Sequence, residues 1–119
     1  MHKYSFEKLE VWKLSRQLVK KIYKISKSFP ADEKYGMTSQ LRRAVVSVPT
    51  NLAEGSARKT GKDKANFTTN SYSSLMEVLN LLILAADLEY IHENIVNELR
   101  PDIEEISNKL NALRNSQAA

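Results

Sequence analysis

The sequence of 119 residues contains no cysteine, which excludes disulfide bonds, thiolate metal sites and a cysteine nucleophile. It contains only three glycines and three prolines, and strand-like alternation is missing outside residues 45–46. Its longest apolar run, residues 81–86, is far shorter than the roughly 20 residues that span a bilayer. The N-terminal residues are polar and lack the apolar core of a secretory signal. We therefore expect a soluble, cytoplasmic, all-α protein without a membrane partner.

Four segments repeat apolar residues at steps of three and four, the pattern of amphipathic helices. We expect helices at about residues 6–28, 34–59, 61–89 and 94–114, with Trp12 and Tyr23 widening the first apolar face. Because short connections force consecutive helices to run in opposite directions, the sequence predicts one domain over residues 1–119, an antiparallel up-down-up-down four-helix bundle. The expected core positions are Val11, Ser15, Leu18, Ile22, Ile25, Phe29, Met37, Leu41, Ala44, Val48, Leu52, Phe67, Ser71, Ser74, Val78, Leu81, Ala85, Leu88, Val96, Leu99, Ile103, Ile106, Leu110 and Leu113.

Prolines and capping residues bear on where these helices begin and end. Pro49 predicts either a break or a kink, and the apolar spacing that continues to Leu52 favours one kinked helix. Pro101 leaves open whether the fourth helix is continuous or begins at this proline. Thr60, followed by Asp63 three residues later, predicts the N-cap of the third helix.

Charge is distributed unevenly along the chain, whose net charge is +4. Residues 1–30 carry a net charge of +6 and residues 31–60 carry +2, whereas residues 61–90 and 91–119 each carry −2. A basic first half joined to an acidic second half predicts a side that faces a polyanion, or complementary contacts between helices or subunits.

Five cations of the first helix fall within about 80° of one another, opposite its apolar face, and extend over about 20 Å of helix axis. Such a row can contact several phosphates at once, and we call it the basic stripe. It contains no interleaved aromatic residue, so we expect binding to the nucleic-acid backbone without base stacking. The alternative is a solvated face that keeps the protein in solution. The candidate nucleic-acid-binding residues are Lys13, Arg16, Lys20, Lys24 and Lys27 of the basic stripe, with Arg42 and Lys59 in addition.

A second row of polar residues, which we call the polar stripe, follows the second helix about 110° from its core face. Glu54 and Arg58 have the spacing of an ion pair within one helix, and Arg43 is expected to meet a carboxylate from elsewhere, with Glu77 as the candidate. Polar positions in phase beside an apolar face favour a subunit or partner interface over a half-exposed flank. The candidate interface residues are Gln40, Arg43, Ser47, Asn51, Glu54, Arg58 and Glu77.

Residues suited to catalysis are few and scattered. His2 lies at the terminus and His92 in a connection, where it can cover the start of the fourth helix, so no paired imidazoles are expected. Ser56 and Lys59 match the Ser-x-x-Lys pattern, which is weak by itself and leaves a serine–lysine enzyme as a minor alternative. No nucleotide-binding or metalloprotease motif is present. We expect no enzymatic activity, no metal and no cofactor.

Two segments resemble a known family. The first helix opens with Phe-Glu-x-Leu-x-Val-Trp (residues 6–12), and Phe-Pro-x-x-Glu-x-Tyr-Gly (residues 29–36) follows it. Residues 42–58 read Arg-Arg-Ala-Val-Val-Ser-Val-Pro-x-Asn-Leu-Ala-Glu-Gly-Ser-x-Arg. Together these segments are similar to the four-helix-bundle proteins encoded in intervening sequences of bacterial 23S ribosomal RNA genes, and the similarity covers residues 6–91.

The resemblance implies a ring-like homopentamer and a second helix that continues through Pro49. The accessory protein of diversity-generating retroelements is similar in fold, and its basic surface engages nucleic acid and a reverse transcriptase. One departure is Ser73, where the family commonly has the glycine of a Gly-Ser-x-x-Glu segment. We expect a serine at this position to prevent the closest approach of the helices.

The leading hypothesis is therefore a non-enzymatic oligomer that binds RNA or DNA backbones through the basic stripe. The alternative is a protein–protein adaptor that docks a partner on the polar stripe, with the lysines only solvated.

Overall fold

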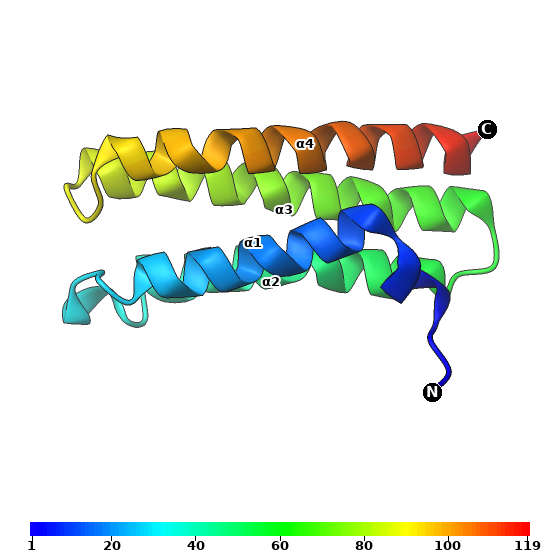
Figure 1. Cartoon of the computed structure of the whole chain (residues 1–119), viewed down its shortest axis with the longest axis horizontal. Helices are drawn as coiled ribbons and strands as arrows, with labels where there is room; N and C mark the ends of the chain where they lie inside the picture. Colours follow the sequence, from blue (N-terminus) through cyan, green and yellow to red (C-terminus); the bar gives the residue numbers. More distant parts are fainter.

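The computed structural model describes residues 1–119 and contains four α-helices and no β-strand. The helices are α1 (Glu10–Ser26), α2 (Met37–Ser56), α3 (Gly61–Asp87) and α4 (Glu93–Ala118), and two short 3-10 helices are η1 (Ser5–Lys8) and η2 (Ala31–Glu33). In Figure 1 the chain follows α1 toward the left, returns along α2, goes back along α3 and returns along α4. The predicted all-α class and the number of helices are confirmed.

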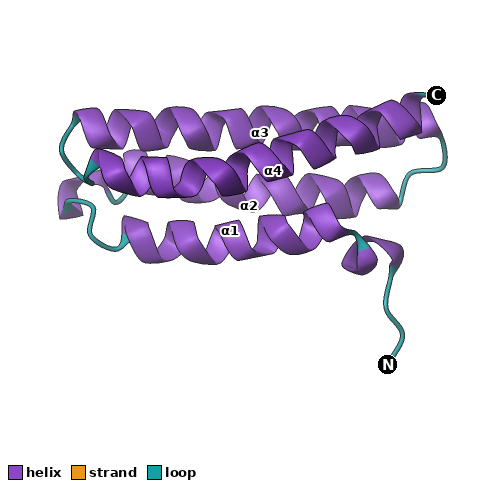
Figure 2. Ribbon diagram, turned by 45° about the horizontal axis from the view of Figure 1, so that its top comes forward, coloured by secondary structure: helices purple, strands orange, loops and turns teal.

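Each helix packs against two others: α1 against α2 and α4, and α3 against α2 and α4. The two diagonal pairs, α1 with α3 and α2 with α4, make no contact. In Figure 1, α3 and α4 lie above α1 and α2, and Figure 2 shows the connections gathered at the two ends of the helices. A cluster of 19 buried apolar residues from the four helices and the α1–α2 connection fills the space between them.

Most of the expected core positions are buried, but the end of the first helix differs. Ile25 is only half-buried, and the next residue, Ser26, is buried in its place. The Ser26 hydroxyl accepts a hydrogen bond from Nε of Arg42 at 2.9 Å, which satisfies this polar group inside the protein. Leu88, also expected in the core, is 52% exposed because it follows the last residue of α3.

The first two helices are shorter than expected. α1 begins at Glu10 because Leu9 is extended (φ −69°, ψ 124°) and separates it from η1. The η1 turn is closed by the Tyr4 amide, which donates to Oε2 of Glu7 at 2.9 Å. α1 ends at Ser26 and α2 spans only Met37–Ser56, because η2 occupies the residues before it.

The ends of the last two helices also differ from the expected ranges. α3 ends at Asp87, and Glu89 then takes a positive φ of 64°, which leads the chain out of the helix. α4 continues to Ala118, past the expected end at residue 114. The hydroxyl of Thr68 in α3 donates to Oε1 of Gln117 at 2.7 Å, which ties this last turn to the bundle.

Both helix prolines lie inside continuous helices, Pro49 in α2 and Pro101 in α4. Pro101 therefore does not split the fourth helix. Pro49 has no N–H, so it cannot donate to the carbonyl of Val45. One residue before it, the Val48 carbonyl accepts a hydrogen bond from the Ser71 hydroxyl at 2.8 Å, which joins α3 to α2 beside the proline. The bend at Pro49 stays a prediction.

Gly55 allows α2 and α3 to approach each other closely. A Cβ atom at this position would lie 2.7 Å from Cβ of Phe67, a distance that real Cβ atoms essentially never show. Because the Phe67 atom is fixed to the backbone of α3, rotation of a side chain cannot relieve this contact. The glycine of the Ala-Glu-Gly segment is therefore required by the packing of two helices.

Candidate nucleic-acid interface

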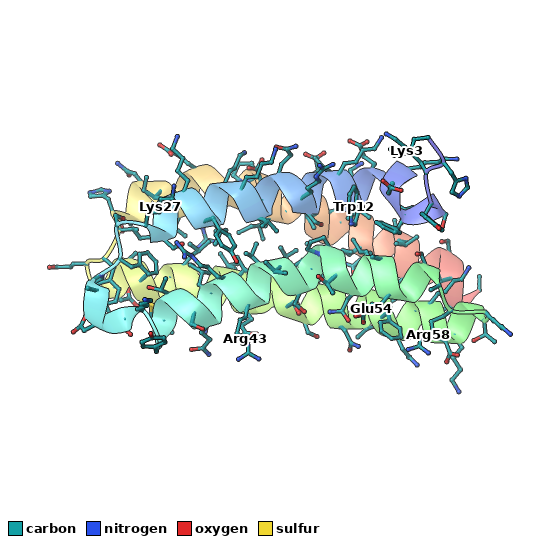
Figure 3. All side chains as sticks on the ribbon, turned by 90° about the horizontal axis from the view of Figure 1, so that it is seen from below. Lys3, Trp12, Lys27, Arg43, Glu54 and Arg58 are labelled. Carbon is teal, nitrogen blue, oxygen red and sulfur yellow. The ribbon has the colours of Figure 1, made fainter.

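The five cations of the basic stripe are all exposed along α1 and at its end. Buried residues at helical spacing, such as Val11, Leu18 and Ile22, hold the opposite face of α1 in the core. The stripe therefore faces outward. In Figure 3, Lys27 lies on the α1 side of the bundle, and Arg43, Glu54 and Arg58 lie along the opposite edge. Arg43 and Arg58 thus lie on a different side of the bundle from the basic stripe, whereas Glu54 also lines a groove together with Arg16 and Lys20.

No carboxylate of the chain pairs with the basic stripe. The one ion pair in the structure joins Nζ of Lys21 to Oδ2 of Asp102 at 2.6 Å, and it links α1 to α4 beside the stripe. Lys21 lies off the stripe, since it follows Lys20 by 100° around the helix. The cations of the stripe therefore have no ion-pair partner within the chain.

The two additional candidates occupy different surroundings. Arg42 is half-buried: Nε donates to the Ser26 hydroxyl, Nη2 donates to the Tyr23 carbonyl at 3.4 Å, and the guanidinium lies 4.6 Å from the centroid of the Tyr23 ring. It thereby holds the last turn of α1, where the Tyr23 carbonyl also accepts a hydrogen bond from the Ser26 hydroxyl at 3.3 Å. Lys59 is exposed in the connection between α2 and α3.

An apolar groove lies next to the basic stripe, between η1, α1 and α2, and we call it the Trp12 groove. It has a volume of about 510 Å³. Its apolar lining comes from Phe6, Trp12, Val19, Val46, Pro49 and Ala53, and its charged lining comes from Arg16, Lys20 and Glu54.

Trp12 brings an aromatic ring to the basic stripe. The guanidinium carbon of Arg16 lies 5.3 Å from the centroid of the Trp12 ring, and Phe6 packs edge-on against the same ring at 5.2 Å. Trp12 is only half-buried, although it also packs against the core. No aromatic residue belongs to the row of cations, but Trp12 lies beside the stripe and contacts Arg16. The contact between Trp12 and Arg16 follows from their i, i+4 spacing on α1, whereas the contact between Phe6 and Trp12 depends on the position of η1.

Part of the polar stripe bonds within the chain. The Ser47 hydroxyl lies 2.9 Å from the hydroxyl of Ser74 in α3, and Nδ2 of Asn51 donates both to the Ser47 hydroxyl at 2.8 Å and to the Ser47 carbonyl at 2.9 Å. These half-buried groups connect α2 to α3. Ser73, the departure from the family pattern, is exposed and takes no part in this contact.

The other members of the polar stripe, Gln40, Arg43, Glu54 and Arg58, are exposed. Arg43 and Glu77 line one polar groove of about 440 Å³ between α2 and α3, but they form no ion pair. Glu54 and Arg58 do not pair either, because the guanidinium of Arg58 lies 4.6 Å from the centroid of the Phe67 ring. Neither expected ion pair is present. Arg43 and Glu77 nevertheless line the same groove.

A carboxylate–phenol contact at one end of the bundle was not foreseen from the sequence. The Tyr90 hydroxyl donates to Oε2 of Glu33 at 2.7 Å, and the Met37 amide donates to Oε1 of Glu33 at 3.1 Å. The hydrogen bond from Tyr90, followed by that from Met37, lowers the pKa of Glu33 below its ordinary value of 4.5. The same bond to Glu33 raises the pKa of Tyr90 above 10.0. The acidic residues Asp32 and Glu33 before α2 could be recognised in the sequence. The partner Tyr90 could not, because it lies 57 positions away from Glu33.

The residues weighed for catalysis make local helix-end contacts. His92 is the N-cap of α4, where Nδ1 accepts a hydrogen bond from the Asn94 amide at 3.1 Å. The Thr60 hydroxyl caps α3 as predicted and accepts from the Asp63 amide at 3.1 Å. The Ser56 hydroxyl donates to the Ala53 carbonyl at 2.7 Å, and no hydrogen bond joins it to Lys59.

The structure gathers no group of three potential metal ligands, and none of its helices has the length and apolarity to cross a membrane.

Comparisons with known proteins agree with this fold. The chain is similar to a crystal structure of a protein of unknown function from the S23 ribosomal protein family of Bacteroides thetaiotaomicron, with a TM-score of 0.79 and 21% identity. The similarity covers 87% of this chain and 97% of the other. No curated protein matches the sequence significantly. The family described as 23S rRNA-intervening sequence protein matches residues 7–112. The chain therefore belongs to the family of 23S rRNA-intervening sequence proteins.

Proposed function

We propose that the protein binds the sugar–phosphate backbone of RNA or DNA through the basic stripe and that it carries out no reaction. The observation behind this function is the row of exposed, unpaired cations along α1. From Lys13 to Lys27 the row extends over about 21 Å at 1.5 Å per residue, which is enough to meet several successive phosphates. Arg42 contributes less, because its guanidinium holds the end of α1, whereas Lys59 is free to contact phosphate.

The proposal includes self-assembly of an antiparallel up-down-up-down bundle, kinked at Pro49, into a homopentamer. Arg43 and Glu77 present exposed charges without ion-pair partners in the chain, and Gln40 presents an exposed amide; a second copy can supply partners for all three. Assembly repeats the basic stripe, so that weak phosphate contacts on several subunits act together. A cytoplasmic location, where RNA and DNA are both accessible, fits this function.

A salt titration tests the backbone-binding function. If each of the five cations neutralises one phosphate, the logarithm of the binding constant for duplex nucleic acid falls with the logarithm of salt with a slope of about −4.5. Changing Lys20 and Lys24 together to Glu is expected to remove about 1.8 from the steepness of that slope and to weaken binding at every salt concentration.

Lys62→Glu with Lys64→Glu provides the matched control, because it changes the net charge equally on α3, which does not contact α1. We expect this control to bind nearly as tightly as the natural protein. A shallow salt dependence, or equal weakening by both pairs of changes, would contradict the proposal.

The second candidate function is docking of a protein partner in the polar groove between α2 and α3. Arg43 and Glu77, which line this groove without pairing to each other, are the observation that favours it. Arg43→Gln is the test, measured as the subunit number by light scattering after gel filtration. A change in subunit number assigns the groove to self-assembly, and an unchanged number leaves it for another protein.

A further inference from the structure

The Trp12 groove adds a second kind of binding surface to the basic stripe. Its lining is mainly apolar, and its volume of about 510 Å³ is in the range of small-molecule sites. Arg16 and Lys20 belong both to the stripe and to the groove lining. A strand whose phosphates lie on the stripe therefore passes the opening of the groove.

We propose that the Trp12 groove binds an unstacked nucleobase of a single-stranded nucleic acid while Arg16 and Lys20 hold the flanking phosphates. This binding mode rests on the proposed function, because the stripe supplies the phosphate contacts. In the structure Arg16 lies over the Trp12 ring, with its guanidinium carbon 5.3 Å from the ring centroid. A base that enters the groove takes the place of Arg16 on the indole, and the displaced guanidinium turns to the flanking phosphate. The carboxylate of Glu54 in the groove repels a phosphate, so that the base and not the backbone enters.

The proposal distinguishes single strands from duplexes. Bases in a duplex are stacked and paired, so none of them reaches the groove unless it is flipped out of the stack. A single strand can turn a base into the groove at little cost. Stacking of one base corresponds to roughly a 10- to 100-fold gain in affinity, so we expect a single strand to bind at least about tenfold more tightly than a duplex.

Trp12 is the only tryptophan of the chain, so its fluorescence reports on the groove directly. The experiment titrates the full chain at low salt with a short labelled oligouridylate, alone or annealed to its complementary strand. Label anisotropy measures binding, and Trp12 emission measures stacking. We expect the single strand to quench Trp12 and to bind more tightly, and the duplex to bind weakly with little quenching.

The two readouts separate the possible failures. Saturable binding of the single strand that leaves Trp12 emission unchanged, or equal affinity for the duplex, overturns base binding in the groove and leaves the backbone-binding function intact. No anisotropy change with either probe overturns the proposed function, and base binding with it.

A pair of variants tests the same groove. Trp12→Leu keeps the groove apolar and removes the aromatic ring, so it is expected to weaken single-strand binding about tenfold and to leave duplex binding unchanged. Tyr72→Leu is the control, since this half-buried aromatic residue of α3 lies beside Arg114 of α4 and away from the groove. Equal affinities for Trp12→Leu and the natural protein would overturn the proposal. If Trp12→Leu fails to fold, the quenching of the natural protein still decides the question.

Discussion

Substitution of Gly55 by alanine tests the close packing of α2 against α3, because two effects of opposite sign compete there. Within a helix, alanine is more favourable than glycine by about 1 kcal/mol. Against this gain, the new Cβ would lie 2.7 Å from Cβ of Phe67, which is attached directly to the α3 backbone. Overpacking typically costs about 1–3 kcal/mol, and because one of the two helices must move to make room, we expect a cost in the upper part of that range, about 2–3 kcal/mol.

The net expectation for Gly55→Ala is a loss of about 1–2 kcal/mol in the free energy of unfolding. At about 4 °C per kcal/mol for a chain of this size, the melting temperature falls by about 4–8 °C. Urea unfolding followed by far-UV circular dichroism measures the first quantity, and a thermal scan measures the second.

Glu54 provides the internal reference, because it is the exposed neighbour of Gly55 on α2. Glu54→Ala is expected to be about 1 kcal/mol more stable than Glu54→Gly, which measures helix propensity at this place without a packing change. If Gly55→Ala stabilises the protein by the difference that this pair gives, the close approach of the two helices is refuted.

Two further predictions concern the ends of the helices. Below pH 4.5 the stabilising contribution of Glu33 is expected to fall as the pH drops through the lowered pKa of the folded state. Above pH 10.0 the stabilising contribution of Tyr90 is expected to fall as the pH rises through the raised pKa of the folded state. Melting temperatures across this range check both signs. Tyr90→Phe, which keeps the Met37 bond, should remove the Tyr90 contribution from the alkaline side and reduce the Glu33 contribution on the acidic side. An unchanged alkaline side would speak against the contact. Thr60→Ala and His92→Ala each remove a helix cap and are expected to lower stability by about 1 kcal/mol, measured by urea unfolding. Thr69→Ala, at an exposed position inside α3, should change stability little, and a loss as large as that of Thr60→Ala would contradict the capping role.

The fold was largely predictable because helical periodicity is a local property. Val11, Leu18 and Ile22 recur at steps that can only form one face of a helix, and the cap at Thr60 needs no partner beyond Asp63. The burial of Ser26 in place of Ile25 was not predictable in this way. It depends on Arg42, which belongs to another helix and reaches Ser26 only after the two helices have packed.

In the candidate site, too, some features follow from local spacing and others depend on how the helices pack. The outward direction of Lys13, Lys20 and Lys27 follows from their spacing on α1, and the structure places all three in solvent. The Trp12 groove depends on how α2 and η1 lie against α1, which depends on the whole bundle. For Arg43 the sequence predicted an ion pair with Glu77, and the structure brings the two residues to one groove without pairing them. The distance between two flexible side chains could not be predicted from the sequence.

The two layers of Figure 1 differ in charge, since α1 and α2 come from the basic half of the chain and α3 and α4 from the acidic half. The molecule therefore has an electric dipole that points from the α3–α4 layer toward the α1–α2 layer, across the helix axes. Near a polyanion this dipole rotates the protein until α1 and α2 face the target before any contact forms. Such pre-orientation raises the rate of encounter at low ionic strength, and salt should slow arrival more than it hastens departure.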